Sequence, residues 1–161
     1  MSHKKRKSKP YRPMASLTNP LSLLLPAPRK DATMLLTKFH MALEMMARGQ
    51  HPGVEEWRDI ADIVNTVETL CVEQKLLPLQ VMPWVQLAAH AMANCGMRHH
   101  AGRGFRLDGP GMLAIQQVLN FYIDALGALT ARDMGTARAL TEKRMAAYRS
   151  GAPVGVDVVS V

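Results

Sequence analysis

Five basic side chains lie within nine residues near the middle of the chain: Arg98, His99, His100, Arg103 and Arg106. The neighbouring glycines allow a backbone to approach a ligand closely. The segment comes just before a predicted helix, and the free amides and dipole of a helix N-terminus attract anions. These residue types therefore predict a phosphate or carboxylate site, although the segment lacks the Gly-Lys-Ser/Thr ending of a P-loop. In the alternative interpretation, Arg98 and Arg106 pair with acidic residues of the helix predicted from residue 54 to about 73, and the histidines are exposed.

A second basic cluster lies at the N-terminus. Residues 1–30 contain eight lysines and arginines and no acidic residue, whereas the whole chain has a net charge of +7, so the remainder is close to neutral. Such an arm suits contact with phosphates, and a tyrosine within it could stack on a base. The alternative is a solubilising arm. The predicted nucleic-acid-binding residues are Lys4, Lys5, Arg6, Lys7, Lys9, Tyr11 and Arg12.

Two further surfaces suggest a protein partner. Three methionines follow one side of the helix predicted from residue 31 to residue 48, away from its main apolar face. Either the leucine-rich part of the arm, a neighbouring helix or another chain would cover them. The next predicted helix carries acidic residues along its outer face, which is either a solvated surface or a contact for a basic partner. The predicted partner-binding residues are Met34, Met41, Met45, Glu55, Asp59 and Asp62.

The sequence contains few candidates for catalytic or metal-binding residues. The sequence contains no Cys-x-x-Cys, His-Glu-x-x-His or Gly-x-Ser-x-Gly motif. His40 and Glu44 share a predicted helix face, but no second helix offers a matching pair of ligands, as a metal centre in a bundle requires. We therefore expect no catalytic residues, no metal and no cofactor, and a metal-dependent helical enzyme is the least favoured alternative.

Cysteine usage and hydropathy bear on the compartment. Only Cys71 and Cys95 occur, each within an apolar helical pattern, which predicts buried free thiols in a reducing compartment. No run of 18 apolar residues is present, so no membrane span is expected. Pro20 and Pro26 bracket an apolar run that is too short for a signal peptide. We expect a cytoplasmic protein that does not associate with membranes.

Apolar residues recur at helical spacing through most of the chain, which predicts an all-α fold. The longest apolar helix should run from Gly109 to Thr130, with Asp108 as its N-cap and Pro110 in its first turn, at the centre of a compact bundle of four to five helices. The other helices are expected at 31–48, from residue 54 to about 73, at 83–97, and from a break at 132–135 to about 148. The predicted organisation is a basic arm (1–30), a helical domain (31–149) and an irregular C-terminal tail (150–161).

Two polar residues fall on predicted buried faces. Glu68 lies close to the apolar stripe of its helix, and a buried carboxylate requires a partner. Arg98, His40 and His90 are candidates that the sequence does not rank. His90 belongs to a predicted helix without Lys, Arg, Asp or Glu, so we expect it to pack in the interior in its neutral form. We expect Leu87 of the same helix to pack in the interior as well.

The layout resembles small uncharacterised helical proteins of proteobacterial phages and other mobile elements. The resemblance lies in the basic opening from Lys4 to Pro13, the helix segment Glu56 to Asp62, and the passage from Arg98 through Gly104 into an apolar helix. It implies a cytoplasmic, non-catalytic accessory or anti-defence protein and supplies no functional residues.

Together these features predict a non-catalytic binding protein that engages nucleic acid or a nucleoprotein complex. The basic arm and the Arg/His-rich turn would make the contacts. The main alternative is a protein-directed inhibitor, for defence evasion or host takeover, or an assembly factor that acts through the methionine-rich or acidic helix face. The sequence leaves the oligomeric state open.

Overall fold

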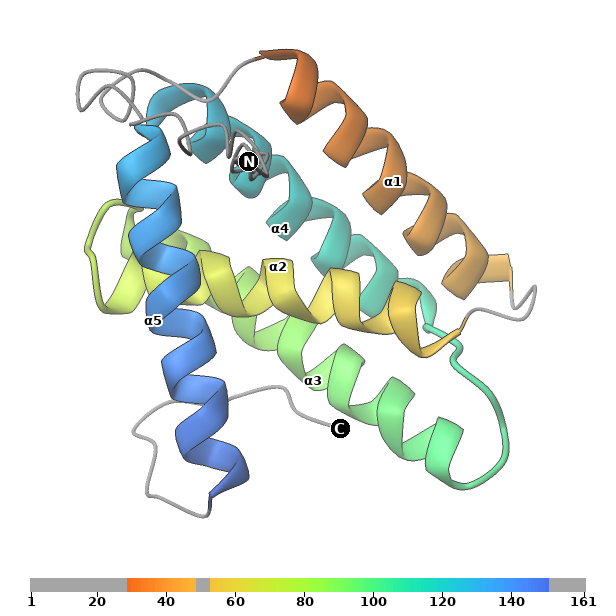
Figure 1. Cartoon of the computed structure of the whole chain (residues 1–161). Coiled ribbons are helices and arrows are strands. Elements are labelled where there is room, and N and C mark those ends of the chain that lie inside the picture. Colours follow the sequence, from red (N-terminus) through yellow and green to blue (C-terminus); the bar gives the residue numbers. More distant parts are fainter. Residues whose placement is uncertain (1–28, 49–52, 151–161) are drawn as a thin grey trace, which may run out of the picture.

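The computed structural model describes residues 29–48 and 53–150 (Figure 1). In these ranges the chain forms five α-helices and one short 3-10 helix, and no strand, which confirms the predicted all-α bundle. The elements are α1 (Arg29–Arg48), α2 (Val54–Val72), η2 (Leu79–Val81), α3 (Met82–His100), α4 (Gly109–Ala128) and α5 (Ala131–Arg149). No helix in the described part combines the length and apolar composition that a membrane span requires. Nearly all of the predicted arm and tail lies outside the described residues.

Helix α4 begins where the sequence predicts. The Oδ1 atom of Asp108 accepts a hydrogen bond from the Gly111 amide at 2.8 Å, and Pro110 occupies the first turn. The helix buries Ile115, Val118 and Leu119 against its neighbours α1, α2 and α3. The N-cap and the apolar periodicity together therefore place this helix correctly.

Helix α2 shares the centre of the bundle with α4. It contacts each of the other four α-helices, and Figure 1 shows α5 lying across it. Every residue from Ile63 to Cys71 is buried. The indole Nε1 of Trp57 donates to the carbonyl oxygen of Met92 at 3.0 Å and so links α2 to α3.

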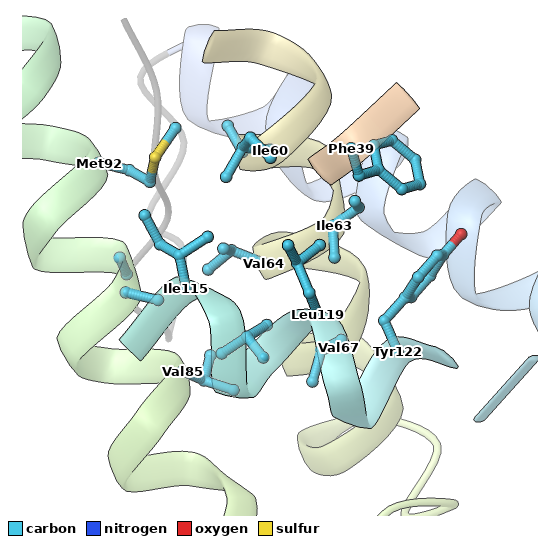
Figure 2. Close-up of a cluster of buried hydrophobic side chains, with 14 of the residues drawn as sticks. Phe39, Ile60, Ile63, Val64, Val67, Val85, Met92, Ile115, Leu119 and Tyr122 are labelled. Carbon is cyan, nitrogen blue, oxygen red and sulfur yellow. The ribbon is translucent and has the colours of Figure 1, made fainter. Parts of the chain in front are cut away.

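The core is assembled mainly from α1, α2, α3 and α4 (Figure 2), and α5 adds Met134 and Ala137. Each large apolar side chain removed from water contributes about 1.5–3 kcal/mol. At Gly111, α4 approaches α3 so closely that an added Cβ would lie 2.6 Å from Cβ of Ala91. The labelled side chains in Figure 2 are Phe39, Ile60, Ile63, Val64, Val67, Val85, Met92, Ile115, Leu119 and Tyr122.

The predicted break at 132–135 is wrong. Helix α5 begins at Ala131 and continues through Gly135 without interruption. Thr130 and Asp133 form a reciprocal cap, in which Thr130 Oγ1 accepts from the Asp133 amide at 3.2 Å and Asp133 Oδ2 accepts from the Thr130 amide at 3.1 Å. This pattern of Thr followed by an acid three residues later is a helix-start signal, and it outweighs the low helix propensity of Gly135.

Helix α3 is longer than predicted and presents a different face. It continues to His100, so Arg98, His99 and His100 form its last turn instead of a loop. Leu87 and His90 are exposed, contrary to the expectation that they pack in the interior. The inner face of α3 is formed mainly by small residues and Met92, which leaves these two positions on the outside.

The partner of Glu68 is none of the three candidates. Its Oε2 atom accepts a hydrogen bond from Nη2 of Arg144 on α5 at 2.6 Å. Arg144 also donates to Oε1 of Glu73 and to the carbonyl oxygen of Asn65, both at 3.2 Å. A buried carboxylate therefore has a partner, as physical chemistry requires, but the partner comes from a helix 76 residues further along the chain.

Candidate functional site

The basic cluster, defined as Arg98, His99, His100, Arg103 and Arg106, lies at the C-terminal end of α3 and in the loop that leads to α4. The helix ends with a tight reversal, in which the amides of Ala101, Gly102 and Arg103 donate to the carbonyls of Met97, His99 and Arg98 at 2.9–3.0 Å. Gly102 and Gly104 have φ angles of 74° and 70°, in the left-handed region that favours glycine. These glycines let the chain turn within a few residues.

Phe105 anchors this loop to the core. Its side chain is only 2% exposed, and its ring stacks on His99 with a centroid distance of 3.9 Å and an interplanar angle of 9°. On the other side it contacts Trp57 of α2 at 6.1 Å. The amide of Leu107 donates to the carbonyl oxygen of Met46 at 3.4 Å. The basic cluster thus lies on the end of α3 and on a loop that is fixed to the body at several points.

The electrostatics at this end differ from the predicted arrangement. The Gly111 amide at the start of α4 already donates to Asp108, so this donor is not available to an external anion. Arg98, His99 and His100 instead lie in the last turn of α3, where cations interact favourably with the helix dipole. Any attraction for anions therefore depends on the guanidinium groups and much less on helix amides.

A shallow cavity of about 410 Å³ lies beside the cluster. Arg98 and Arg103 both line it, together with Asn94, Met97, Ala101 and Asp108. The Nε atom of Arg98 is buried without a hydrogen-bond partner in the described part of the chain. His100 and Arg106 are exposed, whereas His99 is half-buried against Phe105. The structure therefore brings two of the predicted anion-binding residues to one cavity and leaves the others around it.

Three arginines elsewhere in the body form ion pairs, whereas those of the basic cluster, like Arg132, Arg138 and Arg149, form none in the described ranges. Arg48 pairs with Glu44 at 2.8 Å, Arg58 with Glu55 at 3.2 Å, and Arg144 with Glu68. Within residues 29–48 and 53–150, Arg98, Arg103 and Arg106 form no ion pair. The alternative in which Arg98 and Arg106 pair with acids of α2 is not found in these ranges.

The predicted protein-binding residues divide into three groups. Met34 and Met41 are 76% and 62% exposed, and Met45 is half-buried. Among the acids, Glu55 pairs with Arg58, and Oδ2 of Asp59 lies 2.7 Å from Nζ of Lys38. Asp62 lines a cavity between α1 and α5 that the sequence did not predict.

The predicted nucleic-acid-binding residues, from Lys4 to Arg12, lie outside the described residues.

His40 and Glu44 lie on α1, whereas the thiols of Cys71 and Cys95 lie on α2 and α3. His40 and Glu44 are both exposed on α1, and Glu44 is engaged by Arg48. No group of three His, Cys, Asp or Glu side chains is placed to hold a metal ion in the described ranges. Burial raises the pKa of the Cys71 and Cys95 thiols to about 11, which keeps them protonated near neutral pH.

Comparisons with known proteins add no further information. No family model, curated protein or solved structure matches this chain. The candidate site therefore rests on the geometry of the basic cluster.

Proposed function

We propose that this chain is a non-catalytic nucleic-acid-binding protein in which the basic cluster contacts phosphates. The observation that carries the proposal is the set of three arginines that lack ion pairs in the described ranges: Arg98 in the last turn of α3, and Arg103 and Arg106 on the anchored loop that follows. Arginine is suited to this task because its planar guanidinium can donate two parallel hydrogen bonds to a phosphate.

Fixation of the loop supports the same proposal. The stacking of Phe105 on His99 and the hydrogen bond from Leu107 to Met46 hold the loop before any ligand arrives. A preorganised contact loses less conformational entropy on binding than a free loop does. Contacts of this kind position a protein on the phosphate backbone and do not by themselves read the base sequence.

The N-terminal basic residues would add a second, electrostatic contact. If about five arm cations neutralise duplex phosphates, the slope of log K against log salt is roughly −4 to −5 from the arm alone. The resemblance to proteins of phages and mobile elements suggests an accessory protein acting on nucleic acid or on a nucleoprotein complex.

The test is a salt titration of binding. Fluorescence anisotropy with labelled duplex DNA and duplex RNA would measure affinity for the full chain, for a chain without residues 1–13, and for the double variant Arg103→Gln/Arg106→Gln. The double variant should bind more weakly and lose roughly 1.5–2 from the magnitude of the slope, because each phosphate contact contributes about 0.9. Removal of residues 1–13 should flatten the slope further.

Arg48→Gln/Arg58→Gln is the matched control. It removes the same charge from two surface arginines that pair with Glu44 and Glu55. If this control weakens binding as much as the double variant does, the cluster is not the contact. Absence of salt-dependent binding by the full chain would end the proposal.

A protein-directed inhibitor or assembly factor is the second candidate, and the exposure of Met34 and Met41 favours it. Flexible, polarisable methionines suit adaptable protein surfaces. Pull-down from the native host should recover a partner with the full chain and lose it with Met34→Glu/Met41→Glu. Equal recovery by both proteins would show that this face of α1 is not the contact.

A further inference from the structure

A second cavity, of about 320 Å³, lies between α1 and α5 at some remove from the basic cluster. Its floor comes from α2 and α4, so four helices contribute to it. This volume falls at the small end of the range for ligand pockets. The lining residues are Lys38, Phe39, Asp59, Asp62, Ile63, Thr66, Tyr122, Arg138, Thr141 and Glu142.

The inner wall of this cavity is largely apolar. The rings of Phe39 and Tyr122 meet edge to face, with centroids 6.1 Å apart and an interplanar angle of 78°, and Figure 2 shows them on neighbouring helices beside Ile63. The hydroxyls of Thr66 and Thr141 already donate to the carbonyls of Asp62 and Ala137 at 2.6 and 2.9 Å. Phe39, Ile63 and Tyr122 are 7%, 3% and 3% exposed, so each offers only a small part of its surface to the cavity, and the polar donors are mostly engaged.

The mouth of the cavity carries charges of both signs, but the two cations are occupied. Nζ of Lys38 lies 2.7 Å from Oδ2 of Asp59, and Nη2 of Arg138 donates to the hydroxyl of Tyr122 at 3.1 Å. Asp62 and Glu142 have no hydrogen bond or ion pair to their side chains in the described ranges. Both residues are exposed, so their carboxylates face solvent at the mouth of the cavity and are open to a ligand.

The neighbourhood of Asp62 is unfavourable for a negative charge. Partial burial raises the pKa of this carboxyl, and repulsion from Asp59 and Glu142 raises it further, against the opposing effect of Arg138 and Arg58. A cation bound between Asp62 and Glu142 would relieve that repulsion. An anion would instead meet three carboxylates and two cations that are already engaged by Asp59 and Tyr122.

We propose that the cavity between α1 and α5 binds a small organic cation, an ammonium or guanidinium group carried on a short aliphatic chain. The cationic head would lie between Asp62 and Glu142, and the aliphatic part would contact Phe39 and Tyr122. An aromatic face beside a cation adds further attraction. This site is independent of the proposed nucleic-acid contact.

The test uses three probes of equal length and different charge: n-butylamine, n-butanol and butyrate. Binding to the full chain would be measured by calorimetry at neutral pH and by the methyl NMR signals of Ile63, which lines the cavity. The amine should bind and shift the Ile63 signals, and butyrate should do neither. Butanol should bind more weakly than the amine, because it lacks the charge.

Two variants and one matched control locate the site. Asp62→Asn and Glu142→Gln should each weaken amine binding about tenfold or more, as expected for loss of a charge-assisted hydrogen bond. Asp124→Asn removes a charge from an exposed position on α4 that does not line the cavity, and it should leave affinity unchanged. The proposal is overturned if the full chain does not bind the amine, if butyrate binds equally well, or if Asp124→Asn weakens binding as much as Asp62→Asn does.

Discussion

Nη2 of Arg144 on α5 lies 2.6 Å from Oε2 of Glu68 on α2, and the two side chains are 6% and 4% exposed. Around this pair, Arg144 also engages Glu73 and the carbonyl oxygen of Asn65, and the hydroxyls of Thr69 and Thr141 lie 2.9 Å apart. Helix α5 packs mainly on α2 and buries few apolar side chains. This polar network is therefore a main part of what attaches α5 to the bundle.

Replacing Arg144 with Met should destabilise the fold by about 3–5 kcal/mol, because Glu68 would remain buried without its cation. Urea unfolding followed by circular dichroism measures the change. Glu73→Gln is the control, since Glu73 pairs with the same arginine at the more exposed end of the network, and its effect should be below about 1 kcal/mol.

The double variant Arg144→Met/Glu68→Leu should recover much of the lost stability, because apolar residues of similar volume often replace a buried ion pair without loss. If Arg144→Met costs no more than Glu73→Gln, the pair does not hold α5 in place.

Much of the fold could be predicted from the sequence because its signals are local. Apolar periodicity marked the helices, and Asp108 three residues before Gly111 marked the start of α4. The spacing of Met134, Ala137, Thr141 and Arg144 places Arg144 on the buried face of α5, unlike the exposed Lys143 and Arg149. Which carboxylate Arg144 meets could not be predicted from that spacing. A contact across 76 residues depends on how α5 lies over α2, and a single sequence does not encode that as a pattern.

The two candidate sites differ in the same way: one is formed by residues that are neighbours in sequence, and the other by residues far apart in the chain. The basic cluster was visible because its residues are neighbours in sequence, although the extension of α3 to His100 was not. The cavity between α1 and α5 combines Lys38, Asp62, Tyr122 and Glu142 from four helices. The spacing of Arg138, Thr141 and Glu142 places them on one helix face, which is the only local signal that this site offered.

Close approach of α3 and α4 at Gly111 gives a second prediction. An added Cβ would lie 2.6 Å from Cβ of Ala91 and 2.7 Å from Oδ1 of the capping Asp108. Gly111→Ala should therefore destabilise the protein by about 1–3 kcal/mol, because overpacking forces these helices apart. Thermal unfolding measures the difference.

Gly135→Ala, inside α5, is the control for Gly111→Ala, since a Cβ added at Gly135 meets no neighbouring side chain or helix within 4 Å. It should stabilise the protein by about 0.5–1 kcal/mol, because alanine loses less backbone entropy on entering a helix. Equal effects of the two substitutions would contradict the close packing at Gly111.

The two cysteines should be almost unreactive in the folded protein. Cys71 and Cys95 are buried, and burial raises the pKa of each to about 11. At mildly alkaline pH the thiolate fraction alone predicts reaction with a disulfide reagent at least about a hundredfold slower than for a free thiol. Both thiols should react rapidly once guanidinium unfolds the chain. Rapid labelling of either thiol in the native state would show that its helix opens locally.

Stability should rise when Asp62 loses its charge. Because the pKa of Asp62 is raised in the folded state, the ionised carboxylate disfavours folding at neutral pH, and protonation relieves that cost as the pH falls through the folded-state pKa. Asp62→Asn should therefore be more stable than the natural chain at neutral pH, and the gain should shrink as the pH falls through that range. Urea unfolding at several pH values measures this, with Asp124→Asn as control. A loss of stability at neutral pH, or a gain that does not change with pH, would contradict the charge repulsion on which the cavity's affinity for cations depends.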